Sequence, residues 1–243
     1  MIYENEKSAM RTRKNILISI CCILFMGQHL FAQDAVKDLT AVYENYVKLK
    51  YYEMNMAIAY YDQSNSLIPS KQDVAKIVKN GNNYYFSMGK QEVIQKDKHV
   101  LIIDNEEESI YYFSEGNSNQ SQSTDQYKLM LEKLMKQKLT LIGETNGERT
   151  YSYKVNQDMI LSMDMTIDIK NNKLVKVITY YNQKEANSRE EEIPYKVVVE
   201  YKVNDHQVPA ANWFDLNKYI NISNNNVSLT KAYSRFALIN NEE

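Results

Sequence analysis

Few residues of this chain belong to the types that usually carry out chemistry. It contains three histidines and two cysteines, and of these only His99 and His206 lie beyond the first 33 residues. Neither histidine has a carboxylate or a second histidine at the spacing of metal ligands, so the sequence predicts no metal site. We expect His99 to stand at the start of a strand and His206 in a turn, where each is solvated or hydrogen-bonded.

Motifs for nucleophiles and phosphates are also missing from the sequence. There is no Gly-x-Ser-x-Gly elbow, and a chain with only six glycines contains no Walker or Gly-x-Gly-x-x-Gly loop. The nearest clusters of carboxylates are residues 106–108 and 190–192, which fall in loops. Paired catalytic carboxylates need fixed geometry and one desolvated member, whereas consecutive glutamates in a turn usually form a solvated surface. The residues therefore predict neither an enzyme nor a cofactor.

The first 33 residues have the three parts of a secretory signal. Arg11, Arg13 and Lys14 precede an apolar run over residues 16–25, and a short exit follows at residues 31–34. We expect cleavage after Ala32, which makes Gln33 the first residue of the processed protein. Such a signal places the protein in the periplasm.

Two alternatives to a cleaved signal stay open. The apolar run is shorter than the about 20 residues that span a bilayer, but residues 26–32 would extend it into a retained anchor. Lipid modification at Cys21 or Cys22 is the other alternative. Met10 is also a candidate start, because residues 1–9 add nothing that a signal needs.

Cleavage at Ala32 would remove both cysteines and leave 25 basic against 29 acidic side chains, a net charge of −4. No disulfide could then hold the fold, and no thiol could act as a nucleophile or ligand. The slightly acidic balance gives no electrostatic footprint for nucleic acid. The remaining chain of about 210 residues is long enough to bury its own core.

Hydrophobic periodicity predicts an α+β fold. Residues 34–50 repeat apolar side chains at helical spacing, and from Tyr52 the period changes to two, as in a strand. Short strands and turn dipeptides follow, and further helices are expected over residues 125–138 and 227–239. Later strands such as residues 161–169 have one apolar and one polar face, which indicates an antiparallel sheet.

The economical arrangement of these elements is a strongly curved antiparallel sheet, an incomplete barrel, lidded by two or three helices. In this division of the chain the signal peptide occupies residues 1–33 and the half-barrel domain residues 34–220. Residues 221–243 form a C-terminal tail, which is predicted to be helical.

Tyrosine and methionine dominate the larger side chains, with 20 and 11 copies against one tryptophan. Many tyrosines occur in doublets, and a doublet on a strand puts one ring on each face. Ordinary core filling is one interpretation, and a ligand cleft lined by some of the rings is the other. Methionines on strand faces suit a cavity that accepts varied acyl chains, and they also suit an irregular core.

The order of the elements resembles that of the periplasmic outer-membrane lipoprotein carriers and their relatives, the LolA/LolB-like proteins. The stretches that carry the resemblance are a hairpin over residues 91–113, a helix over 127–138, a hairpin over 141–153 and a strand, turn and strand over 165–177. The resemblance spans about residues 34–220. It implies an incomplete barrel whose apolar inner face, lidded by helices, shields acyl chains between membranes without catalysis.

Two functions are expected from these observations. The first is that of an exported, non-catalytic binding protein whose concave face holds a lipid acyl chain or a lipoprotein. The residues expected to line that apolar cavity are Met54, Met56, Ile58, Met163, Met165, Ile167, Val197, Val199 and Tyr201. The alternative is a structural or interaction module that uses the same fold without a ligand and binds an envelope protein of a secretion or envelope assembly.

Overall fold

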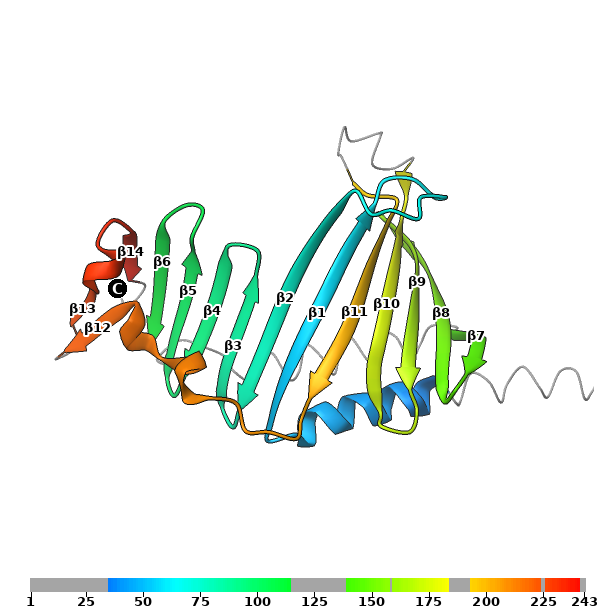
Figure 1. Ribbon diagram of the computed structural model, residues 1–243, viewed down its shortest axis with the longest axis horizontal. Coiled ribbons are helices and arrows are strands. Elements are labelled where there is room, and N and C mark those ends of the chain that lie inside the picture. The colour runs from blue at the N-terminus through cyan, green and yellow to red at the C-terminus, as the bar shows by residue number, and fades with distance from the viewer. Residues whose placement is uncertain (1–34, 115–138, 158, 184–192, 224–225, 241–243) are drawn as a thin grey trace, which may run out of the picture.

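The computed structural model describes residues 35–114, 139–157, 159–183, 193–223 and 226–240. Its strands are β1 (Tyr51–Tyr61), β2 (Lys71–Asn80), β3 (Asn83–Met88), β4 (Gln91–Lys96), β5 (His99–Asp104), β6 (Ser109–Ser114), β7 (Leu139–Thr145), β8 (Glu148–Gln157), β9 (Ile160–Asp168), β10 (Lys173–Tyr181), β11 (Lys196–Asn204), β12 (Ile220–Ser223), β13 (Asn226–Leu229) and β14 (Ala237–Asn240). Twelve of them form one sheet in the order β14-β6-β5-β4-β3-β2-β1-β11-β10-β9-β8-β7, and β12 pairs with β13 separately (Figure 1).

The large sheet consists of two meanders joined by one long-range pairing. β1 to β6 are consecutive neighbours, and so are β7 to β11, whereas β1 meets β11 in pairs such as Met54 with Val203. Neighbouring strands are antiparallel, except that β14 runs parallel to β6. The Asn146-Gly147 dipeptide turns β7 into β8 with φ angles of 54° and 83°. Two successive positive φ angles are what a two-residue hairpin turn requires, and the hairpin expected over residues 141–153 is confirmed.

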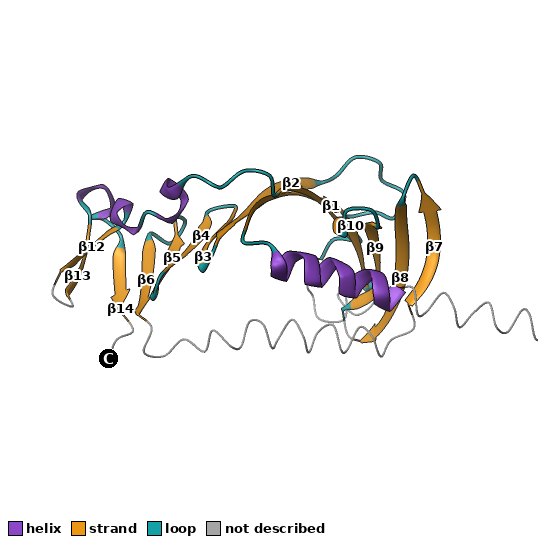
Figure 2. Cartoon of the chain, turned by 90° about the horizontal axis from the view of Figure 1, so that it is seen from below, coloured by secondary structure: helices purple, strands orange, loops and turns teal. Residues whose placement is uncertain are grey.

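The curved antiparallel sheet expected from the sequence is present, but its helical lid differs from the expectation. The sheet stays open, because β14 and β7 end the strand order (Figure 2). In the described ranges one α-helix, residues 35–48, stands where a helix over 34–50 was expected. The helix expected over residues 125–138 lies outside the described residues. None of the described helices has both the length and the hydrophobicity needed to cross a membrane.

The helix expected over residues 227–239 is wrong. This stretch forms β13, a short 3-10 helix at Lys231–Tyr233 (η3) and β14. Val227 and Leu229, two residues apart, both pack on one core, which is a strand spacing rather than a helical one. Pairing with β12 and β6 thus overrides the helical pattern, and the segment that the sequence pattern set apart as a tail adds β14 to the sheet.

The described residues form two hydrophobic cores on opposite faces of the sheet. Figure 2 shows the N-terminal helix on one face and the C-terminal segment on the other. In the first core, Leu39 and Val42 of the N-terminal helix pack against residues of β7 to β10 that include Tyr151 and Met165. We call the face that carries this core the helix face. In the second, the C-terminal segment from residue 213 to 238 packs against β2 to β6 on the other face, which we call the tail face.

Strand register shows that the two cores face opposite ways. Cross-strand pairs lead from Met165 in β9 through β10 and β11 to Ile58 in β1, so these residues share the helix face with Met54. Met54 pairs with Ile77, and the next residue, Val78, belongs to the other core. Successive residues of a strand point to opposite faces, so the covered face changes between β1 and β3.

The tyrosine doublets behave as the pattern predicts. Tyr85 and Tyr112 are buried in the tail-face core, whereas their neighbours Tyr84 and Tyr111 take the helix face. Strands β3 and β6 are therefore apolar on both sides.

A charged cluster fixes the N-terminal helix on the sheet. Asp38 Oδ2 accepts hydrogen bonds from the Tyr151 hydroxyl at 2.6 Å and from Arg149 Nη1 at 3.1 Å. Arg149 Nε also donates to Glu144 at 3.1 Å. The Asp38 side chain is 14% exposed, so its bonds to Tyr151 and Arg149 are largely shielded from water. A hydrogen bond to a charged group in such a place contributes about 1.5–3 kcal/mol.

We expect Asp38→Ala to lower the free energy of unfolding by about 2–3 kcal/mol, because it leaves the Tyr151 hydroxyl and the Arg149 guanidinium without their buried acceptor. Urea unfolding measures the change. The matched control is Glu144→Ala, which removes the outer partner of the same arginine, where the side chain is 49% exposed, and should cost less than about 1 kcal/mol. Equal losses in the two variants would contradict the anchoring role of Asp38.

Candidate functional site

The nine residues predicted to line an apolar cavity all lie on the helix face. They come from β1, β9 and β11, and the strand order places these three within four neighbouring strands. Met56 pairs with Tyr201 and Ile58 with Val199, so the β1 and β11 residues stand side by side. The structure brings the predicted residues together on one surface.

The N-terminal helix fills the β9 end of this surface. Met165 and Ile167 are buried in the core beneath the helix, with 6% and 0% of their surface exposed. Met163 and Tyr201 pack at the margin of the same core. This end is consequently packed by protein rather than hollow.

The helix face stays apolar beyond the helix. A row of cross-strand pairs continues from Met54 through Ile77, Phe86, Val93 and Ile102 to Tyr111. Of the described residues, none in this row belongs to either core, and Ile102 is 36% exposed. We call this row, together with Met56 and Ile58, the β1–β6 apolar face.

The part of this face on β2 to β6 is absent from the predicted set, although the sequence carries a signal for it. Residues 84–86, 100–103 and 110–113 are apolar or aromatic at consecutive positions, instead of alternating with polar residues. Continuous apolar strands are typical of sheets that are covered on both sides. The tail-face core accounts for one side, and the β1–β6 apolar face is the other.

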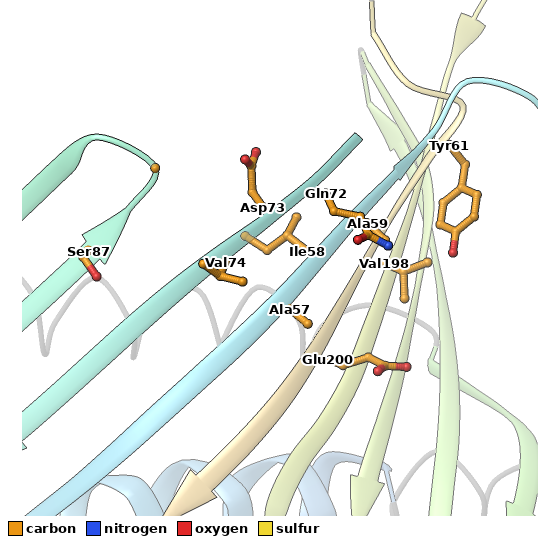
Figure 3. A pocket seen from close by; sticks show the side chains of 11 residues that line it. Ala57, Ile58, Ala59, Tyr61, Gln72, Asp73, Val74, Ser87, Val198 and Glu200 are labelled. Atoms are coloured by element: carbon orange, nitrogen blue, oxygen red, sulfur yellow. The ribbon is translucent and has the colours of Figure 1, made fainter. Parts of the chain in front are cut away.

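A depression lies on the tail face over the second half of β1 (Figure 3). Ala57 and Ala59 line it, together with Val74 and Val198 from the neighbouring strands, and its volume is about 560 Å³. An adjoining depression of about 910 Å³ shares Ala57 and Val74. Of the predicted residues only Ile58 lines the first depression, and Met56 and Tyr201 line the second, so neither hollow is the predicted cavity.

The polar clusters of the described chain tie elements together. Glu92 accepts hydrogen bonds from the hydroxyls of Tyr85 at 3.1 Å and Tyr219 at 2.9 Å, which joins the C-terminal segment to β4. His99 Nδ1 lies 2.8 Å from the Tyr112 hydroxyl, so the expectation of a hydrogen-bonded histidine is confirmed. Within the described ranges no three His, Cys, Asp or Glu side chains gather where they could hold a metal ion.

The acidic turn at residues 106–108 is a structural turn. The Asp104 carboxylate accepts the backbone N–H groups of Glu107 and Glu106 at 3.0 and 2.9 Å. These bonds lower the pKa of Asp104. Glu106 and Glu107 are exposed and Glu108 is half-buried, as expected for a solvated turn. The second acidic run, residues 190–192, lies outside the described residues.

Comparison with known proteins places this chain among loosely similar folds. No protein-family model matches the sequence, and no curated protein matches it either. The chain is similar to an uncharacterized conserved protein from Thermus thermophilus, with 9% identity, a TM-score of 0.43 and coverage of 85% of this chain and 99% of that one. It is also similar to a chain of the MucA/MucB complex from Pseudomonas aeruginosa, with 11% identity, a TM-score of 0.41 and coverage of 81% and 63%.

A LolA superfamily protein from Nitrosomonas europaea is a further similar structure, with 11% identity, a TM-score of 0.28 and coverage of 74% of this chain and 95% of that one. The resemblance to LolA-like proteins expected from the sequence is thus found among solved structures.

We expect stability to fall as the pH rises above about 10, because burial raises the pKa of Tyr46 to about 12 and raises the pKa values of Tyr151 and Tyr219 as well. Unfolded tyrosine titrates near pH 10, so between that pH and about 12 the unfolded chain releases the Tyr46 proton while the folded chain keeps it. The stabilisation is complete below pH 10 and is lost through this window. Urea unfolding at a series of pH values measures the slope, which Tyr46→Phe should reduce. A free energy of unfolding that is constant above pH 10 would contradict the burial of these hydroxyls.

Proposed function

We propose that this chain is an exported, non-catalytic binding protein that holds a lipid acyl chain, or the lipidated segment of a lipoprotein, against the β1–β6 apolar face. The observation that carries the proposal is that β3, β5 and β6 are apolar on both sides, while the C-terminal segment covers only one of them. Apolar sheet surface of this extent is favourable only when something removes it from water.

The chemistry of the β1–β6 apolar face suits an acyl chain. Its side chains are aliphatic, aromatic and thioether groups without charge, and burial of each CH₂ of a ligand contributes about 0.8 kcal/mol. Flexible thioethers such as that of Met56 can adapt to chains of different shape. Such a site holds its ligand by burial alone and needs neither a nucleophile nor a metal.

Export is part of the same proposal. The processed chain would begin near Gln33, and its periplasmic location would place the apolar face between two membranes. The domain would then start with the N-terminal helix, whose Asp38 anchor holds it over β7 to β10.

One observation favours a second function, that of an interaction module in an envelope assembly. The helix already fills the β9 end of the predicted cavity, since Met165 and Ile167 are buried beneath it. A module without a ligand would fill its whole interior in this way and would bind an envelope protein through its outer surfaces. A stoichiometric protein partner, together with no lipid uptake, would favour this second function.

We expect purified protein to take up a fluorescent fatty acid and Met56→Asp to weaken that uptake at least about tenfold, because a carboxylate on the apolar face must be desolvated when the acyl chain binds. The matched control is Val74→Asp. Val74 pairs with Ala57 on the tail face of the next strand and is 74% exposed. Fluorescence titration measures the affinity of both variants for the fatty acid, and thermal unfolding checks that both variants fold.

The control variant should bind like the unaltered protein. If the unaltered protein takes up no fatty acid and carries no lipid that mass spectrometry detects after purification, the lipid-binding proposal is wrong. If Val74→Asp alone weakens uptake, the ligand lies in the tail-face depression instead.

A further inference from the structure

The loop between β1 and β2 exposes two adjacent aliphatic side chains. Leu67 is 94% exposed and Ile68 is 79% exposed, more than any other large hydrophobic residue in the described ranges. Exposed apolar residues are common singly, but a neighbouring pair in one loop presents a continuous apolar surface to water.

Hydrogen bonds hold this loop in place. At its base, Ser70 donates its backbone N–H to the Tyr60 carbonyl at 2.8 Å. Nearer the tip, the Ser66 hydroxyl donates to the Ile68 carbonyl at 2.6 Å. Pro69 restricts Ile68 to an extended backbone. The two side chains are thus held outward by the chain itself.

Five tyrosines, which we call the tyrosine collar, lie at the end of the sheet from which the loop emerges. Tyr60 and Tyr61 end β1, while Tyr180 and Tyr181 end β10 and Tyr195 precedes β11, at the same end of the sheet (Figure 1). Tyr180 and Tyr195 contact each other edge to face at 6.3 Å between ring centroids. Tyrosine is enriched where proteins meet the interface of a bilayer, because its ring is apolar and its hydroxyl is polar.

Two lysines complete the collar. Lys71 Nζ lies 5.1 Å from the ring centroid of Tyr60, and Lys196 Nζ lies 4.6 Å from that of Tyr61. A lysine in this position covers apolar surface with its stem and keeps its ammonium group at the polar level. Lys71 also pairs with Asp73 at 2.8 Å, so the collar carries little net charge.

We propose that this end of the sheet docks on a lipid bilayer, with Leu67 and Ile68 inserted among the acyl chains and the tyrosine collar at the level of the headgroups. The charge of this end selects a zwitterionic surface. Among the described residues at this end, Lys71 and Lys196 are balanced by Asp62 and Asp73, which gives no attraction to anionic lipid.

The docking site stands at the end of the β1–β6 apolar face. Along β1 the helix-face residues Met54, Met56, Ile58 and Tyr60 lead directly to the loop. An acyl chain that leaves the bilayer beside Leu67 would enter this row. That route rests on the proposed function, whereas membrane docking itself does not.

Co-sedimentation with phosphatidylcholine vesicles tests the proposal. The exported protein, with its N-terminus read by mass spectrometry, should sediment with the vesicles, and the double variant Leu67→Ser/Ile68→Ser should partition at least about a hundredfold more weakly, about tenfold for each aliphatic side chain. The matched control is Ile142→Ser/Val208→Ser, which removes two aliphatic side chains that are 56% and 62% exposed and lie away from this loop. The control should sediment like the unaltered protein.

Three results would overturn the proposal: no sedimentation of the unaltered protein, equal loss in both double variants, or binding only to phosphatidylglycerol vesicles that salt abolishes. Uptake of soluble fluorescent fatty acid, measured without vesicles, separates this inference from the proposed function. Uptake without vesicle binding would refute docking alone, whereas vesicle binding without uptake would refute the acyl-chain site alone. The loop variant should keep its uptake of soluble fatty acid.

Discussion

Removal of apolar surface from water on both faces of one sheet is the constraint on which this structure depends. A sheet with a single covered face needs one layer of helices, and its strands alternate between apolar and polar residues. Here the helix covers one face over β7 to β10, and the C-terminal segment covers the other face over β2 to β6. The central strands β1 and β2 lie between the two covers, and the covered face of the sheet changes across them. Among the described residues, neither cover lies over the helix face of β3 to β6, where Ile102 is 36% exposed.

Polar contacts decide where each cover sits. Asp38 fixes the helix through Tyr151 and Arg149, and Glu92 fixes the C-terminal segment through Tyr85 and Tyr219. Burial itself is non-directional, so an apolar helix could slide over an apolar sheet at little cost. A half-buried carboxylate that must keep its partners removes that freedom. Asp38 and Glu92 therefore fix where each cover lies on the sheet and also stabilise it. Neither carboxylate belongs to a sequence motif for catalysis.

Local pattern was sufficient for most of the fold. Period-two segments and the Asn146-Gly147 turn predicted the strands, and the spacing of Leu39 and Val42 predicted the first helix. The pattern failed over residues 227–239, where pairing of β14 with β6 and of β13 with β12 decided the conformation. The β14–β6 pairing leaves no local signal, because β6 lies more than a hundred residues away in the chain.

The candidate site was predicted in part for a similar reason. Alternation placed Met54, Met56 and Ile58 on one face correctly, since that depends only on the strand period. It could not show that Met165 and Ile167 lie under the helix, because periodicity does not say which helix covers which strands. The residues on β3, β5 and β6 were missed because these strands are apolar at consecutive positions, and such a run does not show which side chains point to which face. In such runs only the structure shows that Tyr85 belongs to the tail-face core and that Tyr84 does not.

The single junction between the two meanders has a consequence for how the chain folds. Every other strand pair except β14–β6 joins neighbours in sequence, so each meander can assemble through short loops at low entropic cost. The β1–β11 pairing, as between Met54 and Val203, instead closes a loop of almost one hundred and fifty residues. Long-range strand pairing of this kind is slow, and until it forms both β1 and β11 are unprotected edges. The last strands to meet are thus the central ones, and a chain caught before they meet would present two long edges to its neighbours, with aggregation as the competing outcome.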